Sequence, residues 1–186
     1  MLKYSDIHLR AMAGEDLEII RQWRNSDRVR INMYSDHVIS PEEHANWFNR
    51  AMRDNSARYL ICEINNRPVG FVSFTNIVPM HNRCSWAFYL GETDVPRGAG
   101  AAMEFIALNY SFEELGIRKL CCEVFTFNAG VIKLHEKFGF IQEGKFVKHH
   151  VKNGNYEDIV TLALFKENWD EGKSTLKDKC FSKDGD

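Results

Sequence analysis

Short runs of apolar residues, several of them alternating with polar ones, predict that most of this chain forms β-strands separated by turns. The run 118–127 (RKLCCEVFTF) is nearly continuous in apolar residues, which predicts a central strand covered on both faces. The turns NNRP and NGN separate neighbouring runs in the middle and near the end of the chain. The predicted strands span residues 7–12, 58–64, 69–78, 83–90, 118–127, 141–151 and 156–165.

Apolar residues at helical spacing, together with end signals, predict about four helices. One begins with Ser40 as the N-cap, has Pro41 at its first position and completes a capping box at Glu43. Residues 26–39 are polar and we expect them to be irregular. The residues from Trp169 onward are polar and charged, and we expect a flexible tail there. The predicted helices span residues 14–25, 40–52, 98–115 and 128–140.

The order of these elements indicates the fold class. It reads strand, two helices, three strands, helix, strand, helix and two strands, which predicts an α/β protein of the α+β type with one mixed sheet. A doubly wound fold requires regular alternation of strands and helices, which this chain lacks. We found no internal repeat and no linker, so we expect a single domain over residues 1–168 and a tail over residues 169–186.

Composition and charge narrow the function. The chain has 186 residues, is 44% hydrophobic and carries a net charge of −2, which argues against broad binding of nucleic acid. No apolar run approaches membrane-spanning length and the start has no secretory signal, so we expect no membrane partner and a cytoplasmic location. Five cysteines, an odd number, indicate free thiols. The seven histidines show no ligand spacing, so we expect no metal site.

The stretch VPRGAGAAMEFI, residues 95–106, combines a glycine-containing loop with the start of a predicted helix. The first amides of a helix have no acceptor within it, and together with the helix dipole they favour a bound anion. Small side chains leave room for a pyrophosphate to approach the backbone. Taken alone, this loop fits a phosphate cradle and a simple flexible turn equally well.

A second motif follows the strand at 118–127. Asn128 precedes a helix that ends in LHEKFGF, residues 134–140. The pair of motifs resembles the GCN5-related N-acetyltransferase (GNAT) superfamily, whose helix-start motif [RQ]-x-x-G-x-[GA] is followed by strand, Asn and a helix ending like L-Y-E-K-x-G-F. The resemblance covers about residues 7–166. It implies a mixed, mostly antiparallel seven-stranded sheet that splays between the fourth and fifth strands, flanked by about four helices.

The resemblance also implies an acyltransferase that uses acetyl-CoA as its co-substrate. In the family, loop amides hold the pyrophosphate and the pantetheine arm lies between the splayed strands, where it pairs with backbone groups. Lys133 is a candidate for the CoA phosphates, against the alternative of a solvated lysine. The cofactor-binding candidates are Phe88, Tyr89, Leu90, Arg97, Gly98, Ala99, Gly100, Ala101, Ala102, Asn128 and Lys133.

Three residues are catalytic candidates. The N–H near Leu90 would polarise the thioester carbonyl. His135 stands where many family members have a tyrosine that protonates the leaving thiolate, and histidine is suited to this task near neutral pH; the alternative is a packed histidine without a proton-transfer role. Glu123 lies in an apolar strand, where a carboxylate is costly unless it is paired or used, so it would orient the amine or accept its proton; the alternative is an ion pair with a basic side chain from a neighbouring strand.

The N-terminal half bears on the amine acceptor. Residues 22–48, with W-R-N, then M-Y, then a helix carrying a histidine, resemble the aminosugar-nucleotide acetyltransferases of the pseudaminic acid pathway. Those enzymes acetylate the 4-amine of UDP-4-amino-4,6-dideoxy-N-acetyl-β-L-altrosamine for flagellin glycosylation. The resemblance implies a nucleotide-sugar substrate, with Arg24 as a fork donor to the diphosphate. For His44, which lies on an apolar helix face, the alternative is a plain core histidine. The substrate-binding candidates are Arg24, Met33, Tyr34, His44, Thr75, Asn76, Tyr89 and Glu123.

Other functions stay open at this point. A ribosomal-protein or other protein N-terminal acetyltransferase shares the short motifs of the N-terminal half. A protein that binds acyl-CoA without turnover, as a sensor, is permitted by His135 in place of tyrosine. An aminoglycoside-modifying enzyme would need an acidic pocket, and the segments named above are not notably acidic. The sequence also leaves a homo-oligomer open.

Overall fold

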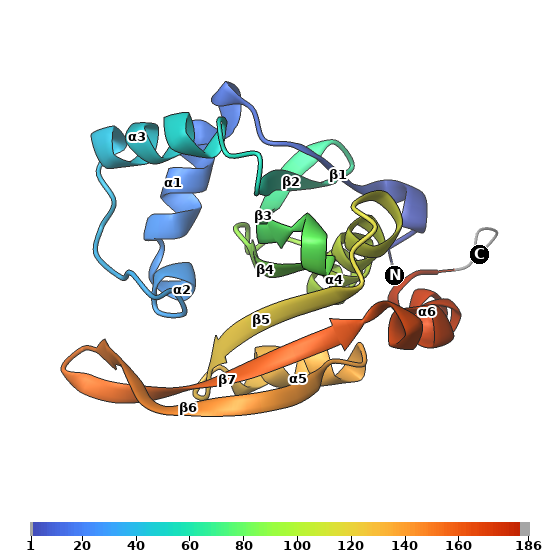
Figure 1. Ribbon diagram of the computed structural model, residues 1–186. Helices are drawn as coiled ribbons and strands as arrows, with labels where there is room; N and C mark the ends of the chain where they lie inside the picture. The colour runs from blue at the N-terminus through green and yellow to red at the C-terminus, as the bar shows by residue number, and fades with distance from the viewer. Residues whose placement is uncertain (1, 183–186) are drawn as a thin grey trace.

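One seven-stranded sheet organises the protein in the computed structural model, which describes residues 2–182. The strand order is β1-β2-β3-β4-β5-β7-β6, and every neighbouring pair is antiparallel except β4 and β5 (Figure 1). This confirms the predicted mixed, mostly antiparallel sheet. The strands are β1 (Ile7–Ala11), β2 (Arg58–Ile64), β3 (Arg67–Val78), β4 (Arg83–Leu90), β5 (Lys119–Phe125), β6 (Ile141–Lys152) and β7 (Asn155–Phe165).

Two helices were not expected from the sequence. The predicted irregular segment contains α2, where the buried Val29 anchors a single turn. The predicted flexible tail contains α6, so that expectation is wrong up to residue 182, and residues 183–186 lie outside the described part. Trp169 of α6 is fully buried against Phe105 and Phe112. A small number of apolar residues in an otherwise polar stretch is therefore enough to dock the helix. The α-helices are α1 (Leu17–Asn25), α2 (Asp27–Arg30), α3 (Pro41–Ala51), α4 (Ala99–Asn109), α5 (Ala129–Lys137) and α6 (Lys166–Cys180).

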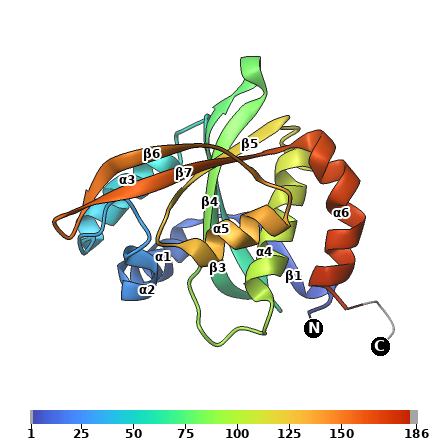
Figure 2. The same cartoon turned by 90° about the horizontal axis from the view of Figure 1, so that it is seen from below.

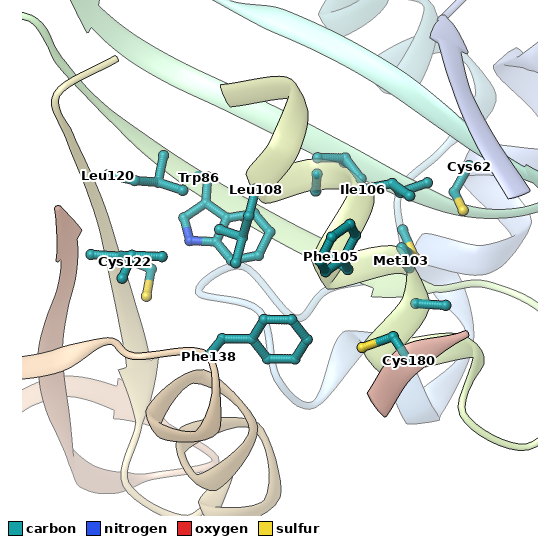
Figure 3. Close-up of a cluster of buried hydrophobic side chains, with 14 of the residues drawn as sticks. Cys62, Trp86, Met103, Phe105, Ile106, Leu108, Leu120, Cys122, Phe138 and Cys180 are labelled. Carbon is teal, nitrogen blue, oxygen red and sulfur yellow. The ribbon is translucent and has the colours of Figure 1, made fainter. Parts of the chain in front are cut away.

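The two faces of the sheet carry separate cores. On β2, Leu60 and Cys62 pack into the large cluster with α4, while Ile61 between them packs against α1 and α3. This alternation follows from the two-residue period of a strand. Figure 2 shows α4, α5 and α6 together on one side, and Figure 3 shows the cluster around Trp86 and α4. Each large apolar side chain buried there contributes roughly 1.5–3 kcal/mol to folding.

The coverage of β5 differs from the expectation. Leu120, Cys122 and Val124 are buried on the side of α4 and α5, but Glu123 on the opposite face is exposed and Cys121 is half-buried. In its middle, β5 is therefore covered on one face and open on the other. The open face lies where β4 and β5 separate. The hairpin of β6 and β7 reaches past the rest of the sheet, and most side chains of β6 are exposed (Figure 1).

No helix within residues 2–182 is long and apolar enough to cross a membrane. Within the same residues, histidine, cysteine, aspartate and glutamate form no group of three that would hold a metal ion.

Candidate active site

The two central strands separate after a short parallel contact. Residues 83–85 of β4 pair with residues 119–121 of β5, and the register goes no further. Gly91 donates its amide to Val69, which places Tyr89 and Gly91 in the hydrogen-bonded register with β3. In an antiparallel ladder the intervening residues point their backbone groups the other way. The amides of Phe88 and Leu90 therefore face the gap toward β5.

This register corrects one expectation. Tyr89 was expected to offer backbone groups to the cofactor together with its two neighbours, but its amide and carbonyl belong to the ladder with β3. Phe88 and Leu90 have backbone groups directed into the gap, as an added strand would require. The splay between β4 and β5 thus provides two of the three backbone positions that the sequence suggested.

The loop between β4 and α4 presents the helix start to the same gap. Gly98 precedes the helix at φ +91°, a left-handed conformation that glycine adopts at no steric cost. The amide of Ala102 bonds to the carbonyl of Gly98, and the side chains of Ala99 and Ala102 are buried in the core. The outward side of this first turn is therefore backbone, and Gly100 lines the gap. Such a turn fits an anionic group close to the chain.

A cavity of about 340 Å³ fills the gap between β4 and β5. It brings together seven residues that the sequence analysis named as candidates for the cofactor or the reaction, and Leu134, which precedes His135. Its lining includes Phe88, Tyr89, Leu90, Gly100, Glu123, Asn128, Leu134 and His135. Arg97 and Lys133 are exposed and do not line this cavity.

His135 is buried and has a partner that sequence reasoning missed. Its Nδ1 lies 2.7 Å from Oε1 of Glu104, a fully buried carboxylate on α4. Burial raises the pKa of Glu104, and the hydrogen bond with His135 acts in the opposite direction. The signal available in the sequence was a single charge within the apolar helix stretch AAMEFIAL.

Glu123 occupies a different environment from the one expected. Its side chain is exposed, so water lowers the cost of its charge. Its Oε2 accepts a hydrogen bond from the hydroxyl of Tyr34. Burial of the phenol, reinforced by this carboxylate, raises the pKa of Tyr34 above its usual range. Tyr34 therefore stays protonated and holds Glu123 at the edge of the cavity.

A second cavity, of about 410 Å³, lies over β2, β3 and β4 on the side of α1 and α3. Five of the eight substrate-binding candidates line it, namely Arg24, Met33, His44, Thr75 and Tyr89. Asn76 is exposed at an irregularity of β3, has φ +51° and is not among the lining residues. Its expected role in this cavity is therefore not supported by its position.

Two side chains that line this second cavity, Arg24 and His44, carry polar atoms without partners among the described residues. Arg24 donates through Nη2 to the carbonyl and hydroxyl of Ser35, but its buried Nη1 has no partner among the described residues. Desolvation lowers the pKa of Arg24. His44 stacks on Trp47, and its buried Nδ1 also has no partner within residues 2–182. Two residues of the cavity lining therefore carry buried, unsatisfied polar atoms next to aromatic rings.

The two cavities adjoin each other, because Met33, Ala87 and Tyr89 line both. Residues 33–36 lie between them and are fastened by the β6–β7 hairpin. Lys152, which is buried, donates to the carbonyl of Met33 and pairs with Asp36. His150 Nε2 lies 2.9 Å from the carbonyl of Tyr34. Lys152 is therefore a structural lysine that fixes this segment to the hairpin.

Comparison with known proteins agrees with this geometry. The family model described as the acetyltransferase (GNAT) domain matches residues 6–141, well over half of the chain. The spermidine N(1)-acetyltransferase of Vibrio cholerae serotype O1 is 24% identical over 166 residues, which cover 89% of this chain and 96% of that protein. The acetyltransferase PseH of Campylobacter jejuni is 25% identical over 127 residues, or 68% of this chain and 78% of PseH.

A solved structure shares the fold. The crystal structure of spermidine N-acetyltransferase from Vibrio cholerae in complex with CoA and spermine has a TM-score of 0.83 at 23% identity, covering 89% of this chain and 98% of that one. Another structure of that enzyme is dodecameric. Splayed central strands, a glycine turn at a helix start and the family match agree with one another. The chain belongs to the GNAT family and is an acetyl-CoA-dependent N-acetyltransferase.

Proposed function

We propose that this enzyme acetylates the amine of an acceptor that carries hydrogen-bond acceptors or negative charge, and specifically the 4-amino group of a UDP-linked 4-amino-4,6-dideoxy sugar. The observation that supports it is the unpartnered Nη1 of Arg24 in the wall of the second cavity. A buried guanidinium N–H that lacks an acceptor costs free energy, which a diphosphate or carboxylate bound at Nη1 would recover. A polyamine offers only donors and positive charges to the same group.

The charged side chains of the second cavity also favour an acceptor with negative charge. Arg24 and Arg50 line it, and Glu43 supplies the one acidic side chain among its lining residues. That carboxylate is already bound by His37 at 2.8 Å. The aromatic wall, with Trp47, Tyr59 and Phe71, suits a uracil or a sugar face.

In the proposed reaction, acetyl-CoA supplies the acetyl thioester. The residues of the cavity between β4 and β5 fit it, since Phe88 and Leu90 direct backbone groups into the gap and Gly100 opens the helix start. The amide of Leu90 stabilises the negative charge on the carbonyl oxygen. Glu123 accepts the amine proton directly or through water, and His135 donates a proton to the leaving sulfur. No step requires an acetylated cysteine.

Acetylation of spermidine is the second candidate. It is favoured by the Vibrio cholerae relative, which covers nearly the whole chain. The unpartnered Nη1 of Arg24 argues against it, and 24% identity leaves the acceptor free to differ. We also propose that the protein forms a homo-oligomer, as its dodecameric relative does. Light scattering of the purified protein would test this.

The test measures release of CoA thiol from acetyl-CoA with three acceptors: the UDP-4-amino-dideoxyhexose, spermidine and a ribosomal N-terminal peptide. We expect selective turnover of the nucleotide sugar. Arg24→Gln should raise its KM at least tenfold, because a charged hydrogen bond contributes about 1.5–3 kcal/mol. The matched control is Arg21→Gln, one turn away on α1, where the guanidinium binds Glu18 instead.

Each outcome has a clear meaning. Selective turnover of spermidine, unaffected by Arg24→Gln, would overturn the nucleotide-sugar proposal in favour of the second candidate. Turnover with the peptide alone would indicate a protein N-terminal acetyltransferase. Acetyl-CoA binding without any thiol release would support a non-catalytic sensor.

A further inference from the structure

The buried carboxylate of Glu104 is not accounted for by the fold. The residue is fully buried on α4, in a segment whose neighbours Met103, Phe105 and Ile106 are core residues. Its Oε1 contacts Nδ1 of His135, and its Oε2 has no partner within the described residues. A carboxylate in this position is expensive compared with an apolar side chain. The free-energy cost of burying this carboxylate suggests that Glu104 serves the function of the protein rather than its stability.

The ring of His135 is held on the other sides by aromatic rings. The centroids of Trp86 and Phe140 lie 5.4 Å and 4.9 Å from the imidazole centroid, and that of Phe88 lies at 6.0 Å. Glu104 therefore provides the polar contact that selects how the ring is turned. Because Nδ1 is bound to Glu104 and His135 lines the cavity between β4 and β5, Nε2 is the nitrogen left for that cavity.

The number of protons on the pair decides what Nε2 can do. When the pair holds two protons, they are arranged either as Glu⁻ with an imidazolium or as protonated Glu104 with a neutral ring. In both arrangements the bond between Oε1 and Nδ1 contains one proton and Nε2 carries the other. Loss of the second proton would leave a net negative charge in a buried site, which is unfavourable. Burial thus favours the state in which Nε2 is a donor.

Other ionisable groups near the pair do not change this balance. Cys122 on β5 and Cys180 on α6 lie close enough to Glu104 for its negative charge to contribute to the raised pKa of each thiol. Burial raises the pKa of Cys180 to about 11 and that of Cys122 further, so both thiols stay neutral near pH 7. The side chains that β4 places around the ring, Trp86 and Phe88, are not ionisable. Glu123 also acts on Cys122, from the exposed face of β5.

We propose that Glu104 is a positioning residue that keeps the second proton on Nε2 of His135 and directs it into the cavity, so that the pair acts as the proton donor of the transfer. This rests on the acetyltransferase mechanism proposed above. The amine nitrogen forms the amide bond while the bond from carbonyl carbon to sulfur breaks. The sulfur takes the proton from Nε2, the amine proton leaves to Glu123 or water, and solvent returns one proton to the pair.

The first experiment is a double-mutant cycle with the active acceptor. Glu104→Gln keeps the shape and removes the charge, so kcat should fall about 10- to 100-fold while KM for acetyl-CoA changes little. In a His135→Tyr background the same substitution should change kcat less than twofold. Glu136→Gln, an exposed neighbour on α5, is the matched control and should leave kcat unchanged.

An unchanged kcat in Glu104→Gln, or an equal loss in both backgrounds, would overturn the proposal in favour of a purely structural role. If Glu104→Gln does not fold, ¹⁵N chemical shifts of the wild-type histidines supply the answer, with His135 assigned by its absence in His135→Tyr. We expect a protonated Nε2 at the pH of maximal activity, and an unprotonated Nε2 would overturn the proposal. This measurement needs no acceptor, so a failure of the proposed substrate is distinguishable from a failure of the pair.

Discussion

Two glutamates that stand in apolar stretches of the chain end up in opposite environments. Glu123 lies in KLCCEVFTF and its side chain is exposed beside Tyr34, whereas Glu104 lies in AAMEFIAL and is fully buried against His135. At the scale of the residue, what decides the chemistry is the face of the element from which a side chain projects. The same applies to the cysteines of β5, since Cys122 is buried and Cys121 is half-buried.

Cys122 lines the cavity between β4 and β5 but is a poor nucleophile. Burial raises the pKa of its thiol, and the thiolate is the reactive form. We therefore expect Cys121→Ala and Cys122→Ala to retain turnover within about threefold, as direct transfer requires. Intact-mass spectrometry after mixing with acetyl-CoA should detect no acetylated protein. A protein-bound acetyl group that forms rapidly and disappears in either variant would contradict direct transfer.

At the scale of the element, α1 is fixed against the chain that leaves β4. Trp23 on α1 donates through Nε1 to Glu92 at 2.7 Å, and Arg28 on the following helix α2 donates to the carbonyl of Gly91 at 2.7 Å. A Cβ on Gly91 would lie 2.0 Å from the indole of Trp23. This close approach sets the position of α1, which carries Arg24 into the second cavity, relative to the end of β4.

Gly91→Ala should displace Trp23 or the backbone and destabilise the protein by about 1–3 kcal/mol. It should also raise KM for the acceptor, since Arg24 moves with α1. The matched control is Gly14→Ala, because an added Cβ there meets nothing within 4 Å. Urea unfolding and steady-state kinetics measure both effects. Equal stability of the two variants would show that α1 yields to the extra methyl group without cost.

At the scale of the whole molecule, a charged network joins the first strand to the rest. Arg10 on β1 bonds both oxygens of Asp16 at 2.7 Å and Oε1 of Glu63 on β2 at 2.6 Å. Asp16 is buried and also accepts the amide of Ala13. Burial opposes its ionisation, but the bonds from Arg10 and Ala13 prevail and lower the pKa of Asp16. The network thus fixes the N-terminal end of α1 to β1 at the edge of the sheet.

Because the pKa of Asp16 is lower in the folded state, ionised Asp16 stabilises the fold at pH values above its unfolded pKa, about 4. This stabilisation is lost as the pH falls through the folded pKa. Asp16→Asn should cost about 1.5–3 kcal/mol at pH 7, and the difference from wild type should shrink toward pH 3. Urea unfolding across this range measures it. The exposed pair Asp27–Arg30 offers Asp27→Asn as a control with an expected cost below about 1 kcal/mol, and a constant difference for Asp16→Asn would contradict the role.

The sequence by itself determined the seven strands to within two residues at each end, the α4 start motif and the family resemblance. These follow from local causes: the two-residue and 3.6-residue periods, caps and turn residues, and a short motif with fixed spacing. It also indicated part of the lining of each cavity, because the resemblance assigns roles residue by residue. It did not indicate α2 or α6, whose few apolar residues are stabilised only by the surfaces they meet.

Only the tertiary structure decided which backbone groups of β4 are free, how Lys152 holds residues 33–36, and that Glu104 meets His135 across 31 positions of the chain. Each of these depends on register or on contact between elements that are distant in sequence. A one-residue change in register would reverse every face of a strand, and no local pattern records which helix turn lies opposite which ring. The contact between Glu104 and His135 therefore exists only once α4 and α5 are packed together.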